Sequence, residues 1–181
     1  MSIYFGDVRQ VGIIVRDVKR AMNAWAHLGV GPFITMDVVF DDFRYYGRPS
    51  AAPHVTIALA YSGSMQIELI QQHNDVPSGY RDFLANGREG VQHLGAFFAD
   101  HASYNAKRAE LLDRGFMLVH EGGSRARDMR FAYFASRERE GLEFEITEAL
   151  LPPFDQFWPR LQQAARDWDG KELIARDLQP G

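Results

Sequence analysis

The sequence predicts an α+β protein in which two βαβββ modules form one cupped mixed sheet, followed by a C-terminal helical extension. The evidence for two modules is a repeat of two β-rich segments. QVGIIV at 10–15 resembles HLGAFF at 93–98, and QIELI at 66–70 resembles EFEIT at 143–147. Both pairs occur in the same order with similar spacing, which favours duplication over the alternative, a chance match of short β-rich segments.

The first module is expected at residues 1–73. A β-rich run at 8–15 is followed by Asp17, a good helix N-cap, and by apolar residues at helical spacing up to Leu28, with Gly29 as the stop. Candidate strands follow at 33–40, 43–46, 54–61 and 65–71, and Ser-Gly-Ser at 62–64 indicates a hairpin between the last two.

Residues 74–90 form a polar connector, and the second module is expected at 91–149. Its predicted elements are a strand at 92–98, a helix at 103–114 that ends at Gly115, and strands at 116–120, 131–135 and 142–147. Two prolines at 152 and 153 then break the sheet. Apolar residues from Phe154 to Leu161 predict an amphipathic helix in the extension, 150–181, which covers a module or a partner subunit.

Composition narrows the class of protein. The chain has 181 residues, 46% of them hydrophobic, a net charge of −4 and no cysteine. Disulfides and thiolate chemistry are therefore excluded, and no basic run suggests a nucleic-acid or membrane partner. No apolar stretch is long enough to span a bilayer, and no signal peptide is evident, so we expect a cytoplasmic protein with a small-molecule partner.

The repeat also predicts a site. If the modules pack about a pseudo-twofold axis, Gln10, Glu68, His93 and Glu145 converge, because each is a polar residue on an equivalent strand. An imidazole, two carboxylates and an amide oxygen would suit a divalent metal. The alternatives are a hydrogen-bonded core histidine, solvent-facing carboxylates, and a Gln10 amide that bonds Glu68 or His93 in a metal-free pocket.

Other residues are candidates for binding the substrate. Three roles are open for Arg130: it could pair with the carboxylates of the site, anchor a substrate carboxylate, or be an exposed loop cation. Tyr45, Tyr46 and His54 flank a Gly/Pro-rich loop that would form a pocket rim. Aromatic strand residues, including Phe131 and Tyr133, either pack in the core or line a cup for a hydrophobic or aromatic ligand.

Across residues 7–148 the chain resembles the vicinal oxygen chelate superfamily of glyoxalases, methylmalonyl-CoA epimerases, extradiol dioxygenases and antibiotic-resistance proteins. The segments that carry the resemblance are 11–17 (VGIIVRD), 28–33 (LGVGPF), 92–95 (QHLG) and 141–145 (GLEFE). The resemblance implies that Gln10, Glu68, His93 and Glu145 bind a divalent metal such as Mn²⁺, Co²⁺, Zn²⁺ or Fe²⁺, which acts as a Lewis acid.

Two positions depart from the superfamily pattern. Gln10 stands where His is usual, which favours harder ions and predicts weak or absent metal binding. Thr56 stands where an epimerase carries a second acid/base Glu, which disfavours two-base epimerisation and leaves Thr56 as a further candidate for binding the substrate.

We therefore expect an isomerase or lyase in which Glu145 or Glu68 removes a proton next to a carbonyl. The alternative is a non-catalytic protein that sequesters a small molecule, and a dioxygenase ranks third because only His93 matches an iron-ligand position. The appended helix suggests a homodimer.

Overall fold

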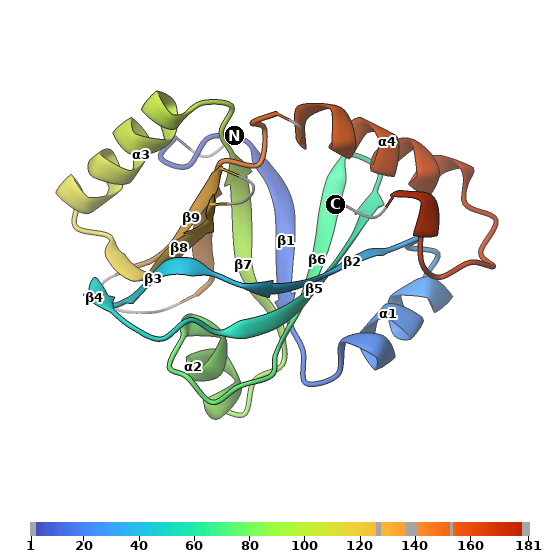
Figure 1. Cartoon of the computed structure of the whole chain (residues 1–181), viewed down its shortest axis with the longest axis horizontal. Coiled ribbons are helices and arrows are strands. Elements are labelled where there is room, and N and C mark those ends of the chain that lie inside the picture. Colours follow the sequence, from blue (N-terminus) through green and yellow to red (C-terminus); the bar gives the residue numbers. More distant parts are fainter. Residues whose placement is uncertain (1–2, 126–127, 137–140, 153, 179–181) are drawn as a thin grey trace.

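The computed structural model describes residues 3–125, 128–136, 141–152 and 154–178, which form one curled mixed sheet with helices on its outside and across its mouth (Figure 1). The sheet has ten strands in the order β2-β5-β6-β1-β7-β10-β9-β8-β3-β4. The fold is α+β, as the sequence predicts. The strands are β1 (Val8–Ile14), β2 (Ile34–Val39), β3 (Asp41–Tyr45), β4 (Arg48–Pro49), β5 (His54–Ser62), β6 (Met65–Gln72), β7 (Gly90–Phe97), β8 (Met117–Ser124), β9 (Met129–Ala135) and β10 (Glu143–Thr147).

Two similar halves meet at the centre of the sheet. β1 pairs in parallel with β6, and β7 pairs in parallel with β10. The halves join where β1 and β7 run antiparallel. Each central strand is therefore the first of its half and lies beside the last, as expected for a duplicated unit with a pseudo-twofold axis at the β1–β7 boundary.

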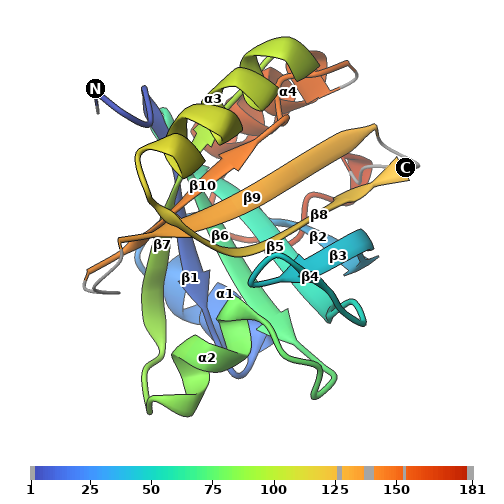
Figure 2. The same ribbon diagram turned by 90° about the vertical axis from the view of Figure 1, so that its left-hand side faces the viewer.

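The sheet curls until its two ends meet. β2 is the outermost strand at one end, whereas β3 lies second from the other end and pairs with β8 of the second half. Only Phe40 separates β2 from β3 along the chain. Strand 41–45 therefore leaves the half in which the sequence places it and closes the cup from the opposite side, so a single chain encloses the concave face (Figure 2).

Helices α1 (Val18–His27) and α3 (His101–Asp113) begin at aspartate caps. The Asp17 side chain accepts a hydrogen bond from the backbone N–H of Arg20, and Asp100 accepts one from Ser103. Both helices stop at a glycine with positive φ, Gly29 at 82° and Gly115 at 82°. These starts and stops agree with the sequence pattern to within two residues.

The connector contains a helix that the sequence pattern does not predict, α2 (Gly79–Ala85). Pro77-Ser78-Gly79 has the composition of a turn, but Ser78 is the N-cap, and its hydroxyl oxygen accepts a hydrogen bond from the N–H of Arg81 at 3.1 Å. α2 buries Tyr80 and Phe83 against the sheet. Pro, Ser and Gly are common both in turns and at helix N-termini, so the sequence at 77–79 does not distinguish a turn from a helix start. The helix becomes evident only in the structure, where Tyr80 and Phe83 are buried.

The extension forms the expected amphipathic helix, α4 (Phe154–Asp167), which buries Phe154, Trp158 and Leu161. The chain then returns to the sheet, where Phe33 and residues 173 and 175 exchange backbone hydrogen bonds of 2.8 Å. A short 3₁₀ turn (Arg176–Leu178) follows. Among the described residues, no helix has both the length and the apolar character needed to cross a membrane.

Candidate metal centre and cavity

Four adjacent central strands bring Gln10, Glu68, His93 and Glu145 to one buried place on the concave face. Their strands are β1, β6, β7 and β10, and their exposed fractions are 4%, 7%, 0% and 7%. Nε2 of His93 lies 3.1 Å from Oε2 of Glu68 and 3.8 Å from Oε2 of Glu145. One ligand atom from each of these three residues lies within 4.8 Å of the others.

Two glycines make room for these side chains. Gly12 pairs with both Glu68 and His93 across its neighbouring strands, and Gly95 pairs in the same way with Gln10 and Glu145. A Cβ on Gly12 would lie 1.8 Å from Cε1 of His93, and one on Gly95 would lie 2.6 Å from Oε1 of Gln10. Both glycines therefore belong to the site. The repeat contains their signal, since Gly12 and Gly95 occupy the same place in its two copies.

A hydrogen-bond chain sets the orientation of the Gln10 amide. Nε2 of Gln10 donates to Oε1 of Gln66 at 2.7 Å, and Nε2 of Gln66 donates to the hydroxyl of Tyr61 at 3.2 Å. Oε1 of Gln10 is then left at the centre, buried and without a hydrogen-bond partner among the described residues. Gln66 thus presents the amide of Gln10 to the site as an acceptor.

The imidazole of His93 is oriented in a similar way. Nε2 of Gln92 donates to Glu143 at 3.0 Å, which leaves Oε1 of Gln92 to accept from Nδ1 of His93 at 2.8 Å. Nδ1 therefore carries a proton, and in the neutral ring the lone pair of Nε2 faces the two carboxylates. This is the tautomer that a metal ligand requires.

The electrostatics of the centre favour a bound cation. Burial, together with the nearby charge of Glu68, raises the pKa of Glu145 well above its usual value. Oε2 of Glu145 is buried and, like Oε1 of Gln10, has no hydrogen-bond partner in the described part of the chain. A divalent metal held by Gln10, Glu68, His93 and Glu145 would satisfy both orphaned oxygens and offset the repulsion between the carboxylates, so these residues fit the ion.

A cavity of about 70 Å³ adjoins the centre. Besides Gln10, Glu68 and Glu145, its lining consists mainly of apolar and aromatic side chains, among them Phe40, Ile57, Tyr80, Phe131, Tyr133, Phe154 and Trp158. Two tyrosines provide hydroxyl groups there. Tyr80 donates to Tyr133 at 3.3 Å, and the Tyr133 hydroxyl lies 3.4 Å from Nε2 of His93.

Both hydroxyls stay protonated, because burial raises the pKa of Tyr80 and Tyr133 well above the usual value. The ring of His120 packs edge-on against both tyrosines. Burial lowers the pKa of His120 to about 3, so this ring is neutral. No sequence pattern marks Tyr80, Phe154, Trp158 or His120 as a site residue, because their positions depend on α2, α4 and the closure of the sheet.

The proposed substrate-binding residues fall into two groups. Phe131 and Tyr133 line the cavity. Tyr45, Tyr46, His54 and Thr56 lie outside its lining. The two tyrosine hydroxyls donate to the carboxylate of Asp82 at 2.8–3.0 Å. Thr56 and His54 lie on β5 beside Asp37 of β2. Oγ1 of Thr56 is 2.7 Å from Oδ1 of Asp37, and Nε2 of His54 is 3.6 Å from the same oxygen.

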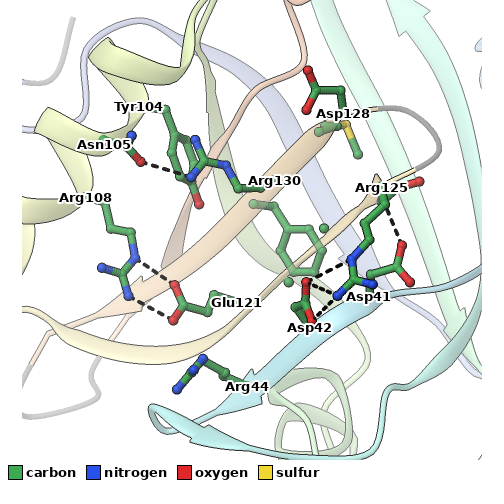
Figure 3. Close-up of a pocket in the computed structure, with 15 residues that line it drawn as sticks. Asp41, Asp42, Arg44, Tyr104, Asn105, Arg108, Glu121, Arg125, Asp128 and Arg130 are labelled. Atoms are coloured by element: carbon green, nitrogen blue, oxygen red, sulfur yellow. Dashed lines mark hydrogen bonds and ion pairs between the residues drawn. The ribbon is translucent and has the colours of Figure 1, made fainter.

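Arg130 lies on the convex face, beneath α3, and not beside the two carboxylates of the centre. Its guanidinium binds both oxygens of the buried Glu148 and lies over the ring of Tyr104. It lines a cavity of about 380 Å³ whose charged side chains largely pair with one another (Figure 3). Two of these pairs are bidentate, Arg108 with Glu121 and Arg125 with Asp42.

We expect Glu148→Gln to destabilise the protein at neutral pH. Burial opposes ionisation of Glu148, but the hydrogen bonds from Arg130 and His101 outweigh it and lower its pKa from 4.5. The stabilisation is therefore present above pH 4.5 and is lost as the pH falls through the lowered folded-state pKa. Both partners are partly exposed, so we expect a loss of roughly 1–2 kcal/mol.

Urea unfolding of both proteins at pH 7 and at about pH 3 measures this difference. The difference should be clear at pH 7 and smaller at the lower pH. Glu110→Gln, in an exposed ion-pair cluster on the same half, serves as the control with little change. A difference that is independent of pH would contradict the assignment to charge.

A curled sheet of paired βαβββ halves, with a Glu-His-Glu cluster that could hold a metal on its concave face, is an arrangement of the glyoxalase type. Residues 9–134 match the family described as the Glyoxalase/Bleomycin resistance protein/Dioxygenase superfamily. The chain belongs to this family, which is part of the vicinal oxygen chelate superfamily whose members typically bind a divalent metal. A search of curated protein sequences finds no significant match.

Solved structures share the fold at low sequence identity. Methylmalonyl-CoA epimerase from Mycobacterium tuberculosis matches with a TM-score of 0.56 and 21% identity, over 81% of this chain and 91% of that one. A variant of the Streptomyces coelicolor epimerase in complex with 2-nitronate-propionyl-CoA gives 0.54 and 18%, over 77% and 92%. A hypothetical protein from Bacillus halodurans gives 0.52 and 19%, over 78% and 92%.

Proposed function

We propose that this protein is a metal-assisted isomerase or lyase that acts at a carbon next to a carbonyl group of a small substrate that has one polar head and is otherwise apolar. The observation that carries the proposal is the buried cluster of Glu68, His93 and Glu145, whose ligand atoms lie within 4.8 Å of one another. The two orphaned oxygens, on Gln10 and Glu145, support it independently.

In this proposal Gln10, Glu68, His93 and Glu145 hold the divalent metal, which supplies Lewis-acid stabilisation of the negative charge that develops on the substrate oxygens. Glu145 takes the proton from the carbon next to the carbonyl. Its carboxylate is buried and lines the cavity, within reach of a substrate held there. Oε2 of Glu68 lies nearer to Nε2 of His93, at 3.1 Å, than Oε2 of Glu145 does, at 3.8 Å, so we assign Glu68 to metal binding and make it the weaker candidate for the base.

The tyrosine pair would provide a second source of stabilisation. Tyr133 is a neutral donor beside the centre, and its own hydroxyl accepts from Tyr80. A buried O–H group directed at a developing enolate oxygen stabilises it without reorganisation of solvent. The aromatic and aliphatic lining excludes water from the same space.

The test is metal content, measured by mass spectrometry on untagged protein before and after stripping and incubation with Mn²⁺, Co²⁺, Zn²⁺ or Fe²⁺. We expect near one equivalent in the wild type and none in a His93→Ala and Glu145→Ala double variant. The loaded protein should also exchange the protons next to the carbonyl of a compact 2-oxo acid, such as pyruvate, with D₂O, as followed by NMR. No bound metal with any of the four ions would overturn the proposal.

The apolar lining of the cavity favours a second candidate, a protein that sequesters a small molecule without turning it over. Such a protein would bind its ligand without a metal requirement and without proton exchange. The same two measurements therefore separate the candidates.

A further inference from the structure

Helix α4 forms one wall of the cavity beside the candidate metal centre. Phe154 and Trp158 line the cavity together with Gln10, Glu68 and Glu145. Their rings are stacked with centroids 5.3 Å apart and planes 10° apart, and they are 5% and 8% exposed. Two adjacent aromatic rings of the extension thus face the ligand space.

Several contacts hold α4 in this position. The indole N–H of Trp158 donates to the backbone oxygen of Ala149, just after β10. Gln162 donates to the backbone oxygen of Gly63, in the hairpin between β5 and β6, at 2.8 Å. Leu161 is fully buried in the same core cluster as Ile57 and Leu59. The helix is therefore packed against the sheet over several turns, as a wall and not as a loosely attached segment.

The space that α4 leaves is small. The cavity measures about 70 Å³. An engineered apolar cavity of about 150 Å³ binds benzene, so this one is too small for a ring while Phe154 and Trp158 stay in place. It suits a compact carbonyl compound of a few non-hydrogen atoms.

This wall lies outside the part of the chain that defines the family. The family match ends at residue 134, twenty residues before α4 begins. The metal-binding positions on β1, β6 and β7 lie within the match, whereas the two aromatic rings are supplied by a segment of this chain beyond it.

We propose that Trp158 and Phe154 determine substrate size, and that they restrict the site to compact carbonyl compounds and exclude substrates with a bulky group beside the reacting carbon. The inference rests on the proposed function for the identity of the reacting group. The size limit itself depends only on the position of α4.

The first experiment needs no metal. Melting temperatures are measured for metal-free wild type, Trp158→Leu, Trp158→Ala and Phe154→Leu, each with and without saturating benzene. A ligand that binds only the folded state raises the melting temperature. We expect benzene to raise it by at least 2 °C in the variants that fold and to leave the wild type unchanged.

Phe157→Ala is the matched control. Phe157 is the neighbour of Trp158 on α4, is partly buried in the same cluster, and is not among the residues that line the cavity. This variant should behave like the wild type. Equal benzene shifts in the wild type and in the cavity variants, or no shift in any folded variant, would overturn the inference.

The second experiment uses Mn²⁺-loaded protein and compares pyruvate with phenylpyruvate in proton exchange. Wild type should favour pyruvate at least tenfold, and Trp158→Leu should narrow or reverse this preference. If neither compound exchanges in any protein, the proposed chemistry fails, while the benzene result still decides the role of α4. If both exchange equally well in the wild type, the size limit fails and the chemistry stands.

Discussion

Gly12→Ala is expected to be the most destabilising single substitution at the site. The new Cβ would lie 1.8–2.3 Å from three atoms of the His93 ring, which is fully buried between neighbouring strands and cannot move aside. Overpacking of this kind costs about 3 kcal/mol or more when no flexible group can yield. The melting temperature should fall by roughly 6–12 °C in a chain of this size.

Gly95→Ala is the matched comparison, because Gly95 occupies the equivalent place in the second half. Its Cβ would meet Oε1 of Gln10 at 2.6 Å, the far end of a side chain that can shift, and Cβ of Gln10 at 3.0 Å, a much milder contact than those at Gly12. We therefore expect a much smaller loss of stability and, at the same time, weaker metal binding, since the displaced atom is a proposed ligand. Equal melting temperatures for the two variants would contradict this account of the glycines.

Glu145→Gln should nearly abolish proton exchange. The loss of a general base typically lowers the rate about 10²- to 10⁴-fold. Glutamine keeps the shape of the side chain and an oxygen atom, so saturating Mn²⁺ should still load the variant, and the loss should persist at any metal concentration. Exchange at the methyl group of pyruvate in D₂O, measured with metal content on the same samples, provides the test.

Glu68→Gln is the control for that experiment. Oε2 of Glu68 lies 3.1 Å from Nε2 of His93, a proposed metal ligand, so we assign this residue to metal binding and not to proton removal. Its substitution should weaken metal binding and leave exchange within about tenfold of the wild type once Mn²⁺ is saturating. If Glu68→Gln loses as much activity as Glu145→Gln under those conditions, the assignment of the base is wrong.

Much of the fold follows from local patterns. The aspartate caps at 17 and 100, the glycine stops at 29 and 115, and the alternation within the strands define α1, α3 and most of the sheet. The repeat places Glu68, His93 and Glu145 on equivalent strands, and the structure brings their ligand atoms together. Successive side chains of a strand point to opposite faces of the sheet, so the face on which each side chain lies can be predicted from the sequence.

Proximity between distant segments is less predictable. The loop that Tyr45, Tyr46 and His54 flank predicts a pocket rim. The curl of the sheet instead moves β3 to β8, and the two tyrosine hydroxyls donate to Asp82. From the sequence alone, Arg130 is a candidate partner for the central carboxylates, an anchor for a substrate or an exposed cation. The alternation along β9 instead sends it to the convex face, opposite to Phe131, where Glu148 binds it.

The sequence by itself determined the α+β class, the two similar halves and the residues at the candidate centre, because these depend on strand periodicity and on duplication. Only the tertiary structure decided how the cup closes and what it can hold. Contacts between distant segments decide both: β3 pairs with β8, α2 buries its Tyr80 against the sheet, and Trp158 of α4 lines the cavity. No local pattern encodes them, since they depend on how far the sheet curls and on where the extension finds apolar surface to bury.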